Sequence, residues 1–167
     1  RIFMPDKETC FAGRSLRSLM CAFRPLCPSC QAKRAALFGM KLAEEVLPAV
    51  PHTHVTFTLP KALRGLFQRD RRLLGILSRS AYAALREVMQ SALGRTDAVP
   101  GFVASLQTFG AFGDNWQPHV HGLVSEGAFT REGDFVTLWN LDTDAVEAKF
   151  REHVLTELQH ADRLTEE

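Results

Sequence analysis

The stretch WQPHVHGLV, residues 116–124, sets two histidines one residue apart in an apolar run. Because side chains alternate across a β-strand, His119 and His121 would project from the same face. One explanation is a pair of neutral core histidines, each hydrogen-bonded to backbone. Imidazole nitrogen atoms are also common metal ligands, and two of them on one face favour a metal site. An oxygen ligand such as Gln117 or Gln107 would suit magnesium, manganese, zinc or iron, with positions left open for substrate.

Strands flank this run on both sides. HTHVTFTLP, residues 52–60, alternates polar and apolar residues, which is typical of a strand buried on one side. Residues 102–112 predict another strand, and residues 135–138 a short one. Turns are expected at 99–101, 113–115 and 132–133. One polar face of the sheet would then carry His52, His54, Thr56, Thr58, Ser105, Gln107, Gln117, His119 and His121.

Helical spacing fills most of the remaining chain. Apolar residues recur every three or four positions over 31–47, 71–93 and 144–160, and residues 61–67 predict a short helix. Strands joined by plain turns are antiparallel. We therefore predict an α+β fold, an antiparallel sheet with helices packed on one face.

Composition bounds the function only loosely. The 167 residues carry a formal net charge of +1, so no global basic field indicates a nucleic-acid partner, although basic residues crowd the first half. No apolar run approaches the roughly 20 residues of a membrane span, and no signal peptide opens the chain. We expect a cytoplasmic protein with no membrane partner. The start at Arg1 and the end at Glu167 suggest a piece of a longer protein.

The four cysteines lie within the first 30 residues. Cys21, Cys27 and Cys30 form C-x5-C-x2-C, and Cys10 is the fourth candidate ligand. Clustered thiolates without a secretory signal favour structural zinc over disulfides, although four unligated cysteines in a reducing compartment are the alternative. This segment has few apolar residues, so metal binding and folding would be coupled. We predict a zinc module and connecting helix over residues 1–47, followed by a catalytic domain over 48–167.

A competing motif uses the same histidines. Gly113, His119, His121, Glu126 and Gly133 spell G-x5-H-x-H-x4-E-x6-G, which looks like the first metal motif of the cupins. Cupins are all-β jelly rolls. The long helical stripes and the missing second motif argue against a cupin-like metal enzyme. A zinc module that only binds DNA, without catalysis, is the other alternative.

Four segments in this order resemble the insertion-sequence-ninety-one type of bacterial transposase: CPSCQAKRAALF, HTHVTFTLPKALRGLF, GFVASLQTFGAF and PHVHGLVSEGAF. The resemblance runs from about Cys21 to the end of the chain. Such transposases belong to the HUH (His-hydrophobic-His) superfamily of rolling-circle nucleases. The resemblance implies a palm-like antiparallel sheet with both histidines on a central strand, preceded by the zinc module.

The resemblance also implies a chemistry, namely nicking and rejoining of single-stranded DNA during transposition. His119 and His121 would bind magnesium or manganese at the scissile phosphate, and a tyrosine would attack to form a 5′-phosphotyrosine link. The family's tyrosines follow the histidine strand, whereas Tyr82 precedes it. We therefore expect a truncated or decayed copy that binds DNA and metal without cleaving the strand.

DNA contacts are expected from the zinc module and the basic residues after it. Lys33, Arg34 and Lys41 would neutralise phosphates. Trp116 and Phe112 would stack on the bases of a single strand, or would instead pack against the sheet. The sequence does not indicate an oligomeric state.

Overall fold

The computed structural model describes residues 27–110 and 115–164, and the chain divides into two compact units, residues 1–49 and 50–167. Cys10, Cys21, Phe112 and most of the predicted turn at 113–115 lie outside the described residues. No described helix is long and apolar enough to cross a membrane.

The first unit contains helix α2 (Pro28–Lys41), which continues into a π-helical turn, η1 (Leu42–Val46). The predicted helix over 31–47 is confirmed, and it begins three residues earlier than expected. Its N-cap is Cys27 and its first residue is Pro28. Proline favours the first helical position because its fixed φ suits a helix and its missing N–H has no partner there.

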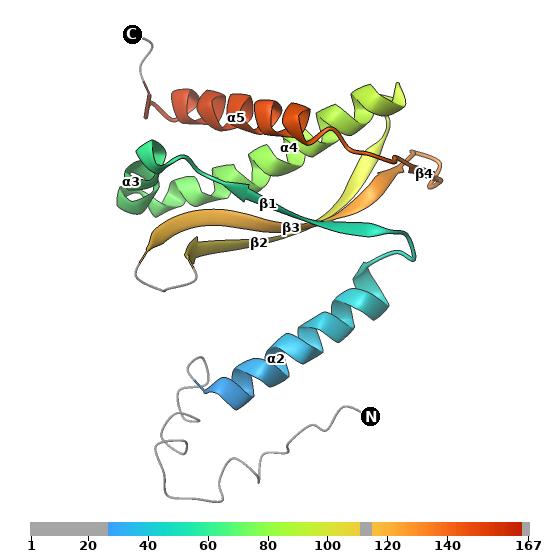
Figure 1. The fold of residues 1–167 in the computed structure, drawn as a ribbon, viewed down its shortest axis with the longest axis horizontal. Coiled ribbons are helices and arrows are strands. Elements are labelled where there is room, and N and C mark those ends of the chain that lie inside the picture. The colour runs from blue at the N-terminus through green and yellow to red at the C-terminus, as the bar shows by residue number, and fades with distance from the viewer. Residues whose placement is uncertain (1–26, 111–114, 165–167) are drawn as a thin grey trace, which may run out of the picture. The chain divides into compact units, whose positions relative to one another are not determined.

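The second unit is built on a four-stranded antiparallel sheet (Figure 1). Its strands are β1 (His52–Thr58), β2 (Val99–Phe109), β3 (Trp116–Phe129) and β4 (Phe135–Thr137). The order is β1-β3-β2, and β4 pairs with the far end of β3. The strand with the two histidines is therefore central, bordered on both sides by a partner strand.

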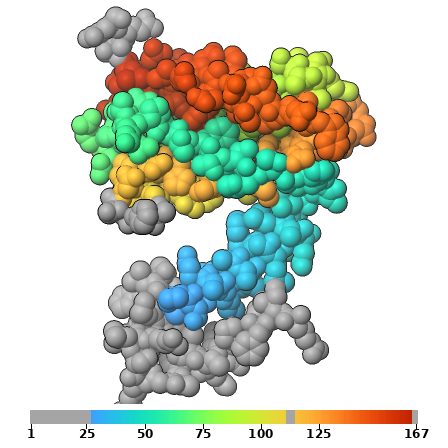
Figure 2. All heavy atoms as spheres, in the orientation of Figure 1, coloured from blue at the N-terminus to red at the C-terminus, as the bar shows by residue number. Residues whose placement is uncertain are grey.

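The remaining helices of this unit are α3 (Lys61–Arg69), the short 3₁₀ turn η2 (Arg71–Leu73), α4 (Leu74–Leu93) and α5 (Thr143–His160). In the space-filling view, α5 lies alongside α3 and the end of β1 (Figure 2). Apolar side chains of α4 and α5 form one buried cluster with Phe57, Val120 and Val124 of the sheet. The predicted α+β fold, with helices on one face of an antiparallel sheet, is confirmed.

The predicted turn at Val99–Gly101 is wrong, because these residues begin β2. The strand has a register shift between Pro100 and Phe102, where the ladder to β3 is interrupted. The buried hydroxyl of Ser125 repairs the interruption: it accepts the Gly101 N–H at 2.9 Å and donates to the Gly127 carbonyl at 2.6 Å. Proline and glycine thus mark a β-bulge here, a feature that local composition does not distinguish from a turn.

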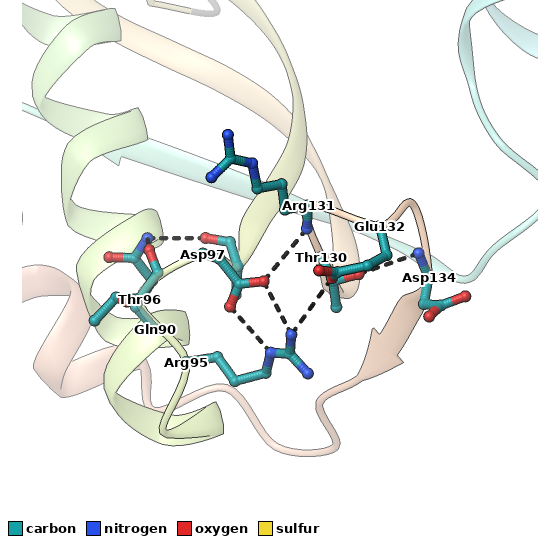
Figure 3. Close-up of polar contacts among 9 residues, drawn as sticks. Gln90, Arg95, Thr96, Asp97, Thr130, Arg131, Glu132 and Asp134 are labelled. Atoms are coloured by element: carbon teal, nitrogen blue, oxygen red, sulfur yellow. Dashed lines mark hydrogen bonds and ion pairs between the residues drawn. The ribbon is translucent and has the colours of Figure 1, made fainter.

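The connection from α4 to β2 is fixed by a charged cluster at one end of the sheet (Figure 3). The Arg95 guanidinium lies 2.9 Å from the Asp97 carboxylate and 3.7 Å from that of Glu132. Asp97 also accepts the Arg131 N–H at 3.3 Å. Hydrogen bonds from Arg95 and Arg131 lower the pKa of Asp97 to about 2. The start of β2 is thereby fastened to the turn between β3 and β4.

Candidate metal centre on the central strand

The histidine pair lies on the sheet face opposite the helices. In β3, Val120 and Val124 point into the core, so His119 and His121 point the other way. Directly opposed residues share a face, and the register places Thr58 and Gln107 beside His119, and Thr56 and Ser105 beside His121. The predicted polar face, formed by alternating residues of three strands, is confirmed.

The two imidazoles of the pair face each other through one nitrogen each. Nε2 of His119 lies 3.1 Å from Nε2 of His121, and the ring planes meet at 74°. Two nitrogen atoms that each lie about 2.1 Å from one ion, at an angle of about 90° to 109°, are roughly 3.0–3.4 Å apart. The observed separation therefore fits two ligands of a single cation. It also fits one hydrogen bond between the rings.

A backbone carbonyl fixes the tautomer of His119. Nδ1 of His119 lies 2.6 Å from the carbonyl oxygen of Gln117. A carbonyl only accepts hydrogen bonds, so Nδ1 carries the hydrogen, and in the neutral ring Nε2 keeps its lone pair. His119 is also buried, with 9% of its surface exposed, which restricts the ring to one orientation. The nitrogen that faces His121 is thus the one available to a cation.

The neighbouring strand supplies the outer contact of His121. Nδ1 of His121 lies 3.1 Å from Nε2 of His54 and 3.4 Å from Oγ1 of Thr56. The rings of His54 and His121 are stacked, with centroids 5.2 Å apart. Because His54 meets the nitrogen that faces away from His119, it is placed to orient the His121 ring rather than to act as a ligand of a cation between the two Nε2 atoms. The sequence indicated that His54 lies on this face, but not which atom it contacts.

The electrostatics of the site favour neutral imidazoles. Burial, with smaller contributions from the charges of His119 and His54, lowers the pKa of His121 below its ordinary value. The residues named above for the polar face include no carboxylate. Glu126 belongs to the other face, where it accepts a hydrogen bond from Thr53 of β1. The cupin-like set of two histidines and this glutamate therefore does not converge on one ion.

The part of the chain that the structure describes offers no third His, Cys, Asp or Glu ligand beside the histidine pair. In residues 27–110 and 115–164, no group of three or more His, Cys, Asp or Glu side chains is arranged to hold a metal ion. Gln117 shares the face of His119 by strand alternation, and its Oε1 lies 3.4 Å from Nδ2 of Asn115. The role of Gln117 as a metal ligand stays a prediction, as does that of the two histidines.

Two aromatic residues singled out in the sequence lie on the helix side of the sheet. The Trp116 indole N–H donates to the carbonyl of Arg64 in α3 at 3.2 Å, and the Arg71 guanidinium lies 4.8 Å from the centre of the Trp116 ring. Tyr82 of α4 stacks on Phe102, which packs against the core. The only tyrosine of the chain is therefore on the wrong face to reach a phosphate held at the histidines.

In the first unit, Cys27 and Cys30 bracket the first turn of α2. Cys27 is buried and Cys30 is half-buried. Their spacing of three places both side chains on the same side of the helix start, as two thiolates of one tetrahedral zinc site require. Lys33, Arg34 and Lys41 lie further along α2 and are exposed.

Comparison with known proteins agrees with this fold. The metal-free structure of the conjugative relaxase TrwC in complex with oriT DNA superposes with a TM-score of 0.51 and 18% identity, covering 78% of this chain and 55% of the relaxase chain. The metal-bound structure of the TrwC complex superposes with a TM-score of 0.50 and 15% identity, covering 76% of this chain and 54% of the relaxase chain. At such identity the likeness concerns the fold alone, so the second unit has a fold similar to that of these relaxase structures.

Matches to known sequence families and to a curated relative give more specific similarities than the fold does. Residues 7–59 match the transposase zinc-binding domain, which includes all four cysteines, and residues 101–167 match the family described as "Putative transposase". The transposase for insertion sequence element IS801 of Pseudomonas savastanoi pv. phaseolicola is 36% identical over 112 residues, 64% of this chain and 25% of that protein. Both family matches are to transposase families, so the chain is similar to insertion-sequence transposases in its cysteine-containing segment and in residues 101–167. It spans about a quarter of the length of that curated relative.

Proposed function

We propose that this chain is the DNA- and metal-binding part of a transposase that nicks and rejoins single-stranded DNA through a 5′-phosphotyrosine link. The observation that carries the proposal is the 3.1 Å approach of the two Nε2 atoms on the central strand, with the outer nitrogen of each ring held by a partner. Metal ligands with such outer contacts are oriented before the ion binds, which raises affinity.

Each residue of the site then has a defined task. His119 and His121 present their Nε2 lone pairs to magnesium or manganese, which would neutralise charge on the scissile phosphate and on the departing 3′ oxygen. The Gln117 carbonyl holds the His119 ring, and His54 holds the His121 ring. Thr58 and Gln107, beside His119, offer neutral hydrogen-bond donors to the phosphate or to waters around the ion.

The attacking hydroxyl has to come from outside residues 1–167, because Tyr82 is on the helix side of the sheet. In the complete reaction, the tyrosine oxygen bonds to phosphorus, and the bond from phosphorus to the 3′ oxygen of the neighbouring nucleotide breaks. The freed 3′ hydroxyl takes up a proton and later reverses the step on a new junction. The bond count is conserved, so neither ATP nor water is consumed.

The first unit would supply DNA contacts of its own. Cys10, Cys21, Cys27 and Cys30 would bind structural zinc, which four thiolates hold as a closed tetrahedral site. The cations of α2, Lys33, Arg34 and Lys41, would contact phosphates. We place the protein in the cytoplasm, where it meets its DNA.

The test is a cleavage assay with the protein extended through its natural downstream sequence. Wild-type protein with Mn²⁺ and single-stranded oligonucleotides from the ends of its element is expected to give an SDS-resistant adduct. Changing both histidines, His119→Ala and His121→Ala, should abolish the adduct, and Tyr82→Phe should leave it unchanged. Loss of the adduct in Tyr82→Phe, or its persistence without the histidines, would overturn the proposal.

A further inference from the structure

Helix α2 combines a uniform charge with exposed apolar side chains. It contains Lys33, Arg34 and Lys41 and no acidic residue. None of its residues is buried, and Phe38 exposes 61% of its surface. Leu37 and Met40 of the same helix are exposed as well, and neighbouring exposed apolar side chains are typical of an interaction surface.

The spacing of these residues puts the aromatic ring among the cations. Arg34, Phe38 and Lys41 are separated by four and three residues, so they lie on one face of the helix. Lys41 has Glu45 at 3.9 Å, and both side chains are 65% exposed, so this pair neutralises little of its charge. The face therefore offers a flat apolar ring with a positive charge about one helical turn away on either side.

We infer that this face of α2, centred on Phe38, binds single-stranded nucleic acid by stacking a base on the ring while Arg34 and Lys41 contact the flanking phosphates. A single strand exposes the faces of its bases, whereas a duplex conceals them between neighbours, so a stacking ring selects single strands. The inference rests on the proposed function only in taking nucleic acid as the ligand, and it uses none of the histidine residues.

Two properties of the binding separate stacking from charge. Base–aromatic stacking is worth ~1–3 kcal/mol per base, so Phe38→Ala should weaken binding of a labelled dT20 oligonucleotide by about 5- to 150-fold. It should not alter the slope of affinity against salt, because no cation is removed. Arg34→Gln should instead reduce that slope by about 0.7, the value for one phosphate contact on a single strand.

The experiment uses the zinc-loaded chain 1–167 and fluorescence anisotropy with dT20 and with a 20-base-pair duplex. Phe38→Trp should restore dT20 binding, and Val46→Ala, which removes another exposed apolar side chain of this unit, should change it less than twofold. Equal losses for dT20 and duplex in Phe38→Ala would overturn the inference. So would a Phe38→Ala protein that loses zinc or melts early, because the ring would then be part of the unit's own packing.

Failure of this inference and failure of the proposed function are distinguishable. His119→Ala should leave the Phe38 effect on dT20 intact while removing Mn²⁺ binding at the histidines. If Phe38→Ala has no effect but the extended protein still forms its adduct, only the inference is wrong. If the adduct is missing and the Phe38 effect persists, the chain binds single strands without the proposed chemistry, and only the proposed function fails.

Discussion

Removing the His54 side chain should weaken cation binding at the histidine pair without disturbing the fold. His54 is exposed, and its Nε2 is the nearer of the two polar atoms that meet Nδ1 of His121. Loss of an outer-shell partner typically costs 10–100-fold in metal affinity, about 1.4–2.7 kcal/mol. Thr56 Oγ1, at 3.4 Å, can take over part of the contact. We therefore expect His54→Ala to weaken cation binding about tenfold. The double variant with Thr56→Val should weaken it by nearer one-hundred-fold.

The quantity to measure is the dissociation constant for Mn²⁺. It is obtained by titrating the zinc-loaded chain with Mn²⁺ and recording the electron paramagnetic resonance signal of the free ion. His52→Ala is the matched control, because it removes an imidazole from the same face of β1 at a position opposite Ser125. Thermal melts should agree among all variants within about 0.5 kcal/mol, as is usual for exposed positions.

Either of two results would refute the reasoning about His54. If His54→Ala binds Mn²⁺ within twofold of the wild type, the contact to Nδ1 does not orient His121. If His54→Ala loses Mn²⁺ binding as completely as His119→Ala does, then His54 is itself a ligand of the ion. In that case the contact between Nε2 of His54 and Nδ1 of His121 breaks when the ion binds.

Three further outcomes follow from the packing and the titration of the site. Ser125→Ala should lower the free energy of unfolding by about 1–3 kcal/mol in urea melts, because the Gly101 N–H loses its acceptor. Gly122→Ala should also destabilise, by about 1–3 kcal/mol, since a Cβ there would overlap Phe102 and lie 2.9 Å from its Cζ. The pKa of His121 is lower in the folded chain than in the unfolded one, so its neutral form favours folding above about pH 6.5. That contribution should be lost as the pH falls through 6.5 towards the folded-state value, and melts of His121→Gln should show less of this acid sensitivity.

Periodicity in the sequence predicted the faces of the sheet well. Over residues 52–58 the alternation is regular, and a period of two assigns each side chain to a face without knowledge of the partner strand. His119 and His121 were placed together on the same argument. Periodicity does not determine the register between strands. If β1 shifted by two residues along β3, every side chain would stay on the same face of the sheet but would have a different cross-strand neighbour. The contact of His54 with Nδ1 of His121 is a property of register, and only the structure supplies it.

The error at Val99–Gly101 and the missing role of His54 have a common physical cause. Both depend on pairing with β3 across many residues of chain. Ser125 lies 24 residues from Gly101, and His121 lies 67 from His54. Local composition reports the conformational preferences of a few neighbouring residues. It does not indicate that a serine hydroxyl of another strand accepts the hydrogen bond of a backbone N–H that the interrupted ladder leaves without a partner.

The central strand couples the stability of the second unit to the geometry of the site. Val120, between the two histidines, is fully buried, and Gly122, just after them, leaves room for the Phe102 ring. An enlarged side chain at either position has to be accommodated by a shift of β3, and that shift moves the imidazoles on the opposite face. Since the ligand nitrogens need to approach within about 0.5 Å of their productive position, small changes in the core should weaken cation binding before they unfold the domain. A Val120→Ile variant that melts like the wild type but binds Mn²⁺ more weakly would show this coupling directly, and unchanged affinity would show that the strand is stiff enough to isolate the site from its core.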